Sequence, residues 1–196
     1  MTCDANSVCQ FENDTVEHTV DGAAVSFTQS HGVLNNCVIR DAADWGMYLS
    51  TSNLRAVNLS ITNVRGGSSE PAGIGIAMDG SDLTASNLTI QNTGGSGIYA
   101  FKKSFLQTNG SSVNGNGGWG IAVLFGSTGS LAGSTVNNNV ATGVFIDDAS
   151  SVVFGGGTYL NNGGGDIFCG HQSAAARFIE TTQYGSTNCP VPAPDI

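Results

Sequence analysis

Apolar residues recur along the chain in short clusters, each opened by a small residue and separated from the next by polar stretches. In the most regular series a glycine, or in the last member an aspartate, stands directly before a mainly apolar triplet. The members are Gly46–Leu49, Gly73–Ile76, Gly97–Ala100, Gly120–Val123, Gly143–Ile146 and Asp166–Cys169, spaced 23 to 27 residues apart. Apolar runs this short, bounded by glycine and polar residues, predict β-strands.

A second apolar cluster follows in every repeat, and an asparagine or aspartate then precedes the next glycine. The clusters lie at 33–39, 54–61, 83–90, 105–113, 131–136 and 152–160. Residues that favour β-structure and turns dominate, which argues against a helical repeat. Strands this short cannot bury themselves, so we expect the coils to stack and to pair their backbones about 4.8 Å apart. The pattern predicts an all-β single-stranded solenoid, a parallel β-helix of about seven coils with 23 to 27 residues per coil.

The ends of such a solenoid expose sheet edges and need protection. The sequence predicts an N-terminal cap over residues 1–21, the parallel β-helix over 22–170, and a C-terminal cap with a linker-like, proline-containing tail over 171–196. A tail of this kind is typical of a domain within a longer surface or secreted protein.

The five cysteines are informative by position. Cys3 and Cys9 lie close together in the first segment, and Cys169 and Cys189 bracket the last one. We expect one local disulfide at each end and a buried free thiol at Cys37, which lies in an apolar run. A metal site is the alternative, but no paired C-x-x-C or nearby histidine supports it. Spacing alone does not establish connectivity. Disulfides predict an extracellular, periplasmic or cell-surface location.

Composition narrows the range of partners. The 196 residues include 28 glycines and only 4 prolines, 40% are hydrophobic, and the net charge is −9. This charge repels a phosphate backbone, so we expect no nucleic-acid partner. No apolar stretch approaches the roughly 20 residues that span a bilayer, so membrane insertion is not expected. Polysaccharide and cations remain the favoured partners.

The Gly-Ile-x-Val-type step, followed by a second strand and an asparagine-rich turn, resembles the pectate-lyase-like right-handed parallel β-helix repeat family. The resemblance covers roughly residues 22–170. It implies a right-handed solenoid, but that superfamily includes polysaccharide lyases, hydrolases, epimerases, phage tailspikes and non-catalytic surface proteins. The resemblance therefore predicts the fold and leaves the activity open.

Stacking makes neighbours of residues at equal distance from the coil-start glycine. Counted from Gly73 and Gly97, Asp79 and Lys103 fall on adjacent coils and are expected to form an ion pair. Such a pair could supply the base of a glycan lyase, but a solvated surface pair is the simpler interpretation.

A second group of candidates lies near the C-terminal end. Asp148 and His171 fall at the same offset, so Asp148 could orient His171 as a general base. Alternatively, Asp147 and Asp148 could hold Ca²⁺, the one cofactor that the sequence suggests. An acidic turn on a polar face is the simpler interpretation. Arginines do not gather at the same offset as these acids, which departs from the pattern of lyases in the superfamily.

Trp45 and Trp119 each stand directly before a coil-start glycine, three coils apart in one column. Indole rings in such a column could contact a glycan that runs along the axis, unless they are buried at a corner.

Two function classes remain. The first is a non-catalytic secreted or cell-surface module that acts as a spacer or weak glycan-binding domain. The second is a fragment of a carbohydrate-active lyase, hydrolase or epimerase, with Lys103, Asp79, Asp148 and His171 as candidate catalytic residues. A short rod without long loops favours the first class.

Overall fold

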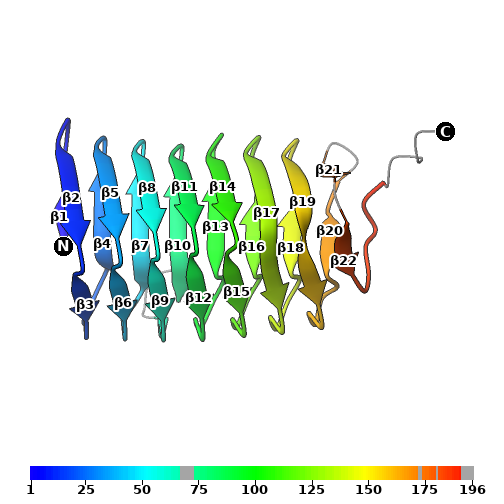
Figure 1. Cartoon of the computed structure of the whole chain (residues 1–196), viewed down its shortest axis with the longest axis horizontal. Helices are drawn as coiled ribbons and strands as arrows, with labels where there is room; N and C mark the ends of the chain where they lie inside the picture. The colour runs from blue at the N-terminus through cyan, green and yellow to red at the C-terminus, as the bar shows by residue number, and fades with distance from the viewer. Residues whose placement is uncertain (67–72, 172–173, 180, 191–196) are drawn as a thin grey trace.

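The computed structural model describes residues 1–66, 73–171, 174–179 and 181–190, and these residues contain strands and turns but no helix. The strands stack in successive coils along one axis, with the N-terminal strands and β22 at opposite ends (Figure 1). One strand from each coil forms an eight-stranded sheet, which we call sheet A. Its members are β1 (Thr2–Cys3), β4 (Ala23–Thr28), β7 (Trp45–Ser50), β10 (Ile74–Asp79), β13 (Ile98–Phe101), β16 (Ile121–Val123), β18 (Val144–Ile146) and β20 (Ile167–Cys169).

The remaining strands form a second, 14-stranded sheet, which we call sheet B. Its first row contains β2 (Val8–Glu12), β5 (His31–Asn35), β8 (Asn53–Val57), β11 (Asp82–Ser86), β14 (Phe105–Asn109) and β21 (Ala175–Phe178). Its second row contains β3 (Thr15–Glu17), β6 (Val38–Arg40), β9 (Ser60–Thr62), β12 (Thr89–Gln91), β15 (Ser112–Asn114) and β22 (Thr182–Tyr184). The long strands β17 (Thr128–Asn137) and β19 (Ser151–Leu160) join the two rows.

Every strand pair is parallel, so the all-β parallel solenoid predicted from the sequence is confirmed. Sheet A has eight strands, which gives about eight turns where the sequence predicted about seven. The additional turn comes from the segment expected to act as a cap, since its strands β1, β2 and β3 pair in parallel with β4, β5 and β6. The domain boundaries themselves stay a prediction, and residues 191–196 of the predicted tail lie outside the described residues.

The core consists of inward columns that run along the axis. In sheet A, Ile98, Ile121 and Val144 are register partners and are fully buried, as the sequence predicted. Because alternate residues of a strand point to opposite faces, the residues between these partners point outward.

From β7 to β18, a column of glycines brings neighbouring coils into close contact near the start of the sheet A strands. A Cβ atom on Gly75 would lie 2.5 Å from the carbonyl oxygen of Gly97, and one on Gly46 would lie 2.7 Å from that of Gly75. No larger residue fits without displacing backbone. The coil-start residue of β10 is therefore Gly75, and the prediction that it is Gly73 was wrong by two residues.

Polar side chains form hydrogen-bonded ladders at the bends. Asn139 lies between Asn116 and Asn162, and the side-chain Nδ2···Oδ1 distances are 2.9 Å on both sides. We call these three asparagines the buried ladder, since Asn116 and Asn139 are buried and Asn162 is partly buried. The Oδ1 atoms of Asn139 and Asn162 also accept a backbone N–H group of the preceding coil. An exposed ladder links Asn13, Asn36, Asn58 and Asn87.

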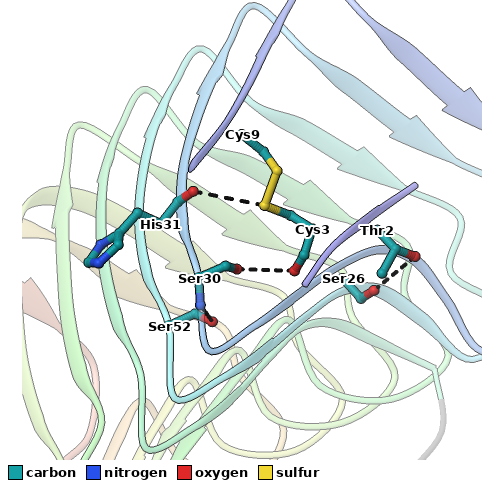
Figure 2. Close-up of a disulfide and its surroundings, with 7 residues drawn as sticks. All are labelled: Thr2, Cys3, Cys9, Ser26, Ser30, His31 and Ser52. Carbon is teal, nitrogen blue, oxygen red and sulfur yellow. Dashed lines mark hydrogen bonds between the residues drawn. A yellow bond between two sulfur atoms is a disulfide. The ribbon is translucent and has the colours of Figure 1, made fainter. Parts of the chain in front are cut away.

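Each end of the solenoid has one disulfide, and these are the pairs that the sequence predicted. Cys3 is bonded to Cys9 and Cys169 to Cys189, while Cys37 is free and buried. Figure 2 shows the N-terminal bond, where Ser30 donates its hydroxyl to the Cys3 carbonyl at 3.1 Å. Two disulfides indicate an oxidising environment outside the cytoplasm. Among the described residues, no helix is long and apolar enough to cross a membrane.

Candidate functional site

The outer face of sheet A carries aromatic rings in register. The outward column through the middle of its strands alternates between large and small side chains over most of its length. From β4 to β20 its members are Ser26, Tyr48, Ala77, Tyr99, Ala122, Phe145 and Phe168. Stacking the coils therefore places rings on this face above one another, with alanines between them.

Trp119 fills the gap that Ala122 leaves in this column. Its ring lies 6.2 Å from that of Tyr99 and 5.0 Å from that of Phe145, with interplanar angles of 20° and 6°. Phe145 stacks in turn on Phe168 at 5.9 Å. Ala122 is fully buried although it is not part of the core cluster, so these rings cover it from outside. We call Tyr99, Trp119, Phe145 and Phe168 the ring stack.

An open depression of about 480 Å³ lies at one end of the ring stack and is lined by Tyr99, Phe101, Lys102 and Phe125. The Phe125 side chain is 53% exposed. Its backbone has a φ of 53°, held by a hydrogen bond of 3.0 Å from the Lys103 N–H to the Phe125 carbonyl. The turn thus presents a phenyl ring to solvent beside two further rings. We call this depression the aromatic depression.

The one cation that lines the aromatic depression is already paired. Lys102 Nζ lies 2.7 Å from Asp79 Oδ2 and 5.1 Å from the centroid of the Phe101 ring. The hydrogen bond to Asp79 raises the pKa of Lys102 above its ordinary value. Burial, together with the negative charge of Asp148, raises the pKa of Tyr99, so the Tyr99 hydroxyl stays protonated at neutral pH.

The acidic candidates lie one coil beyond Phe125. Asp147 Oδ1 contacts His171 Nδ1, and this hydrogen bond, followed by the charges of Asp147 and Asp148, raises the pKa of His171. One ligand atom from each of the three residues lies within 4.8 Å of the others. Two carboxylates could contribute to a Ca²⁺ site, but Ca²⁺ takes six to eight oxygens and not imidazole nitrogen. The donor set therefore fits Ca²⁺ poorly.

The structure changes two of the predicted pairings. Because Gly75, and not Gly73, is the counterpart of Gly97, Asp79 stands opposite Phe101, and its ion pair is with Lys102 and not with Lys103. Likewise, His171 contacts Asp147, although Asp148 is its counterpart by offset. In each case the partner is one residue away from the predicted one.

The candidate catalytic residues form two separate groups. Asp79 and Asp147 belong to one outward column that continues through Phe101 and Leu124. Three coil steps separate the two acids, which corresponds to about 14 Å. The Asp79–Lys102 pair and the Asp147–His171 pair therefore cannot act on the same bond.

The tryptophans share a column as predicted, but their rings are engaged with neighbouring rings. Trp45 stacks on Tyr48 at 5.4 Å, and Trp119 lies between Tyr99 and Phe145. The residues that the sequence analysis missed are Tyr99, Phe101 and Phe125. A signal existed, since Tyr48, Tyr99, Phe145 and Phe168 all stand two residues after the coil start.

A second open depression of about 430 Å³ lies at the turn between the two sheets, nearer to the N-terminus. Its lining includes Gln29, His31, Thr51, Asn53 and Asp82 and contains no aromatic ring other than the imidazole. The apolar lining thus distinguishes the aromatic depression from it.

Fold and outer face together define a right-handed β-helix with an aromatic surface. The sequence matches the family described as "Right handed beta helix region" over residues 2–163, and the chain belongs to that family.

Two solved structures are similar to the chain at low identity. The Dettilon tailspike protein (gp208) is 12% identical with a TM-score of 0.40, over 95% of this chain and 55% of the tailspike chain. This chain thus spans about half the length of that protein. A trypsin-treated variant of QnrB1, a plasmid-mediated fluoroquinolone resistance protein, is 13% identical with a TM-score of 0.22, over 89% of this chain and 86% of the other. No curated protein matches the chain.

Proposed function

We propose that this protein is a non-catalytic, secreted or cell-surface β-helix module that binds glycan at the aromatic depression. The observation that carries the proposal is the lining of that depression, in which Tyr99, Phe101 and Phe125 surround about 480 Å³ beside the rigid ring stack. Small-ligand sites have this range of volume and combine apolar walls with a few polar groups.

The chemistry of the walls fits a sugar. A pyranose ring has apolar C–H faces that stack on aromatic rings, and hydroxyl groups at its edge that need hydrogen-bond partners. The Tyr99 hydroxyl and the Lys102 ammonium group provide such partners at the edge of the depression. Because the ring stack holds Tyr99 in place, little side-chain entropy is lost on binding.

The test compares two exposed phenylalanines of adjacent coils. Phe125 lines the depression, whereas Phe105, 39% exposed, lies on β14 of sheet B. On a panel of immobilised neutral, amine-bearing and acidic oligosaccharides, we expect wild type and Phe105→Ala to bind the same glycans. Phe125→Ala should lose at least tenfold in affinity. Absence of binding to every glycan, or unchanged binding by Phe125→Ala, would refute the proposal.

A second candidate function, cleavage of polysaccharide, is favoured by the contact between Asp147 and His171. A histidine oriented by a carboxylate can act as a general base. One observation weighs against it: the Asp79–Lys102 pair is too far away to assist the group of Asp147, Asp148 and His171. Release of unsaturated or reducing ends, with or without Ca²⁺, that disappears in His171→Ala would establish this alternative.

A further inference from the structure

The charges around the aromatic depression determine which glycans it suits. Lys102 lines it, but its ammonium group is bound to Asp79 and seated over Phe101. Lys103 lies outside the lining. On the opposite side the turn of Phe125 adjoins Asp148, since the Gly126 N–H donates to the Asp148 carbonyl at 2.8 Å. The Lys102 cation is therefore paired, whereas the acidic side has two carboxylates, Asp147 and Asp148, against one imidazole and keeps negative charge even when His171 is protonated.

Asp148 is the more exposed of the two carboxylates beside His171. Its neighbour Asp147 is largely buried and contacts His171, whereas Asp148 is partly exposed. Asp148 follows Phe125 in the column of turn residues, because the Gly126 N–H donates to the Asp148 carbonyl as the Lys103 N–H donates to the Phe125 carbonyl. In agreement with this position, burial and the charge of Asp148 together raise the pKa of Tyr99. The chain as a whole carries a net charge of −9, which adds to the same negative potential.

The depression also accommodates a cation beside its rings. Lys102 Nζ lies over the Phe101 ring within the distance at which an ammonium group is attracted to a ring face. A ligand ammonium group near Phe125 would have a ring and the carboxylate of Asp148 as neighbours. A neutral sugar would use only the ring contacts, and a uronate would be repelled by the acids.

Building on the proposed function, we infer that the aromatic depression selects oligosaccharides with free amino groups, such as β-1,4-linked glucosamine, with Asp148 as the residue that recognises the ammonium group. The inference names the ligand class of the same site, so it stands only if glycan binding itself is established.

Three hexasaccharides with the same linkage test the inference, because they differ only at carbon 2: cellohexaose has a hydroxyl, the N-acetylglucosamine hexamer an acetamide and the glucosamine hexamer an ammonium group. By titration calorimetry at pH 6 and low salt, we expect the glucosamine hexamer to bind wild type at least tenfold more tightly than the other two. Added salt should reduce this preference, because the interaction is electrostatic.

Two charge-matched variants locate the effect. Asp148→Asn should bring the affinity for the glucosamine hexamer close to that for cellohexaose. Glu12→Gln removes the same charge on β2, in the first coil, and should leave the preference within twofold of wild type. Phe125→Ala should weaken binding of all three hexamers.

The outcomes separate the two proposals. Equal affinity for the three hexamers, lost in Phe125→Ala, would overturn the amine preference and support the glycan-binding function. A preference that Asp148→Asn and Glu12→Gln reduce equally would overturn the role of Asp148, because it would then follow from net charge alone. No binding of any hexamer or of any glycan on the panel would overturn both proposals.

Discussion

The outer faces of sheets A and B are built on the same ladder geometry, yet they carry different chemistry. On sheet A the outward column alternates rings with alanine, and the rings stack on one another. On sheet B the corresponding column is mainly polar and contains Arg55, Thr84, Gln107 and Ser130. On both faces, stacking brings equivalent residues of successive coils side by side. The chemistry of a few outward side chains therefore determines which face can bind a ligand.

The difference has an energetic consequence. Rings that contact their neighbours lose apolar surface and are held in place before any ligand arrives. The polar residues of sheet B remain hydrated and gain little from their neighbours. We therefore expect outward substitutions on sheet A to affect stability as well as binding, and most outward substitutions on sheet B to affect neither.

We expect the largest loss of stability from a substitution in the core that lies beneath both faces. Ile121→Asp buries an unpaired carboxylate between Ile98 and Val144 and should cost about 3 to 5 kcal/mol of unfolding free energy. Gln107→Asp, which points outward from β14, should cost less than about 0.5 kcal/mol. Urea unfolding followed by circular dichroism measures both. Equal losses would mean that the inward and outward positions are assigned in the wrong register.

The next effect concerns the buried ladder at the bend that leads from sheet B to sheet A. Asn139→Ala leaves the Asn116 N–H and the Asn116 side chain without their acceptor and should cost about 2 kcal/mol. Asn58→Ala removes a member of the exposed ladder, where water replaces the lost bonds, and should cost about 1 kcal/mol, mainly because alanine is strained at the φ of 52° that Asn58 adopts. The melting temperatures of the two variants test this ranking of the two ladders. A larger loss for Asn58→Ala would contradict the ranking.

A smaller loss of stability is expected from the outer face of sheet A, and comparing it with sheet B tests the difference between the two faces. Trp119→Ala removes two ring contacts from the ring stack and exposes Ala122, so it should cost about 1 to 2 kcal/mol. Arg55→Ala, at an exposed position of β8, should change stability by less than about 0.5 kcal/mol. Equal, small losses in urea unfolding would show that the rings of sheet A do not support one another.

The fold could be predicted well from the sequence because the same pattern of apolar and polar residues recurs in every coil. Periodic apolar triplets indicated stacked strands, and the positions of Cys169 and Cys189 around the last segment predicted a disulfide at the C-terminal end. The coil-start glycine of β10 was predicted incorrectly because Gly73-Ile74 and Gly75-Ile76 are the same pair of residues, and only the register, in which Ile76 pairs with Ile98, distinguishes them.

The candidate site was less predictable. The ring column could have been found by applying the offset rule to aromatic residues. The position of Phe125 could not, because it depends on a positive φ at a non-glycine residue of a turn. Similarly, no pattern indicated that Lys102, and not Lys103, would reach Asp79.

The smallest change in stability is predicted for Asp166, whose carboxylate takes the place of a further asparagine at the end of the buried ladder. Asp166 Oδ1 accepts hydrogen bonds from Asn162, and Oδ2 accepts the backbone N–H groups of Gly185 and Ser186 at 3.0 and 2.9 Å. Partial burial alone would raise the pKa of Asp166, but these hydrogen bonds outweigh it and lower the pKa below its ordinary value. The ionised form thus joins the C-terminal segment to the last coil.

This lowered pKa gives the ladder a pH dependence that the ring stack lacks. Because the pKa of Asp166 is lower in the folded than in the unfolded state, its contribution is complete above the ordinary value of 3.8 and is lost as the pH falls below it. The melting temperature of wild type should therefore exceed that of Asp166→Asn at pH 7, and the difference should shrink between pH 5 and pH 3. Other carboxylates titrate in both proteins and cancel in the comparison, so a constant difference for Asp166→Asn would show that the end of the ladder does not depend on the ionised carboxylate.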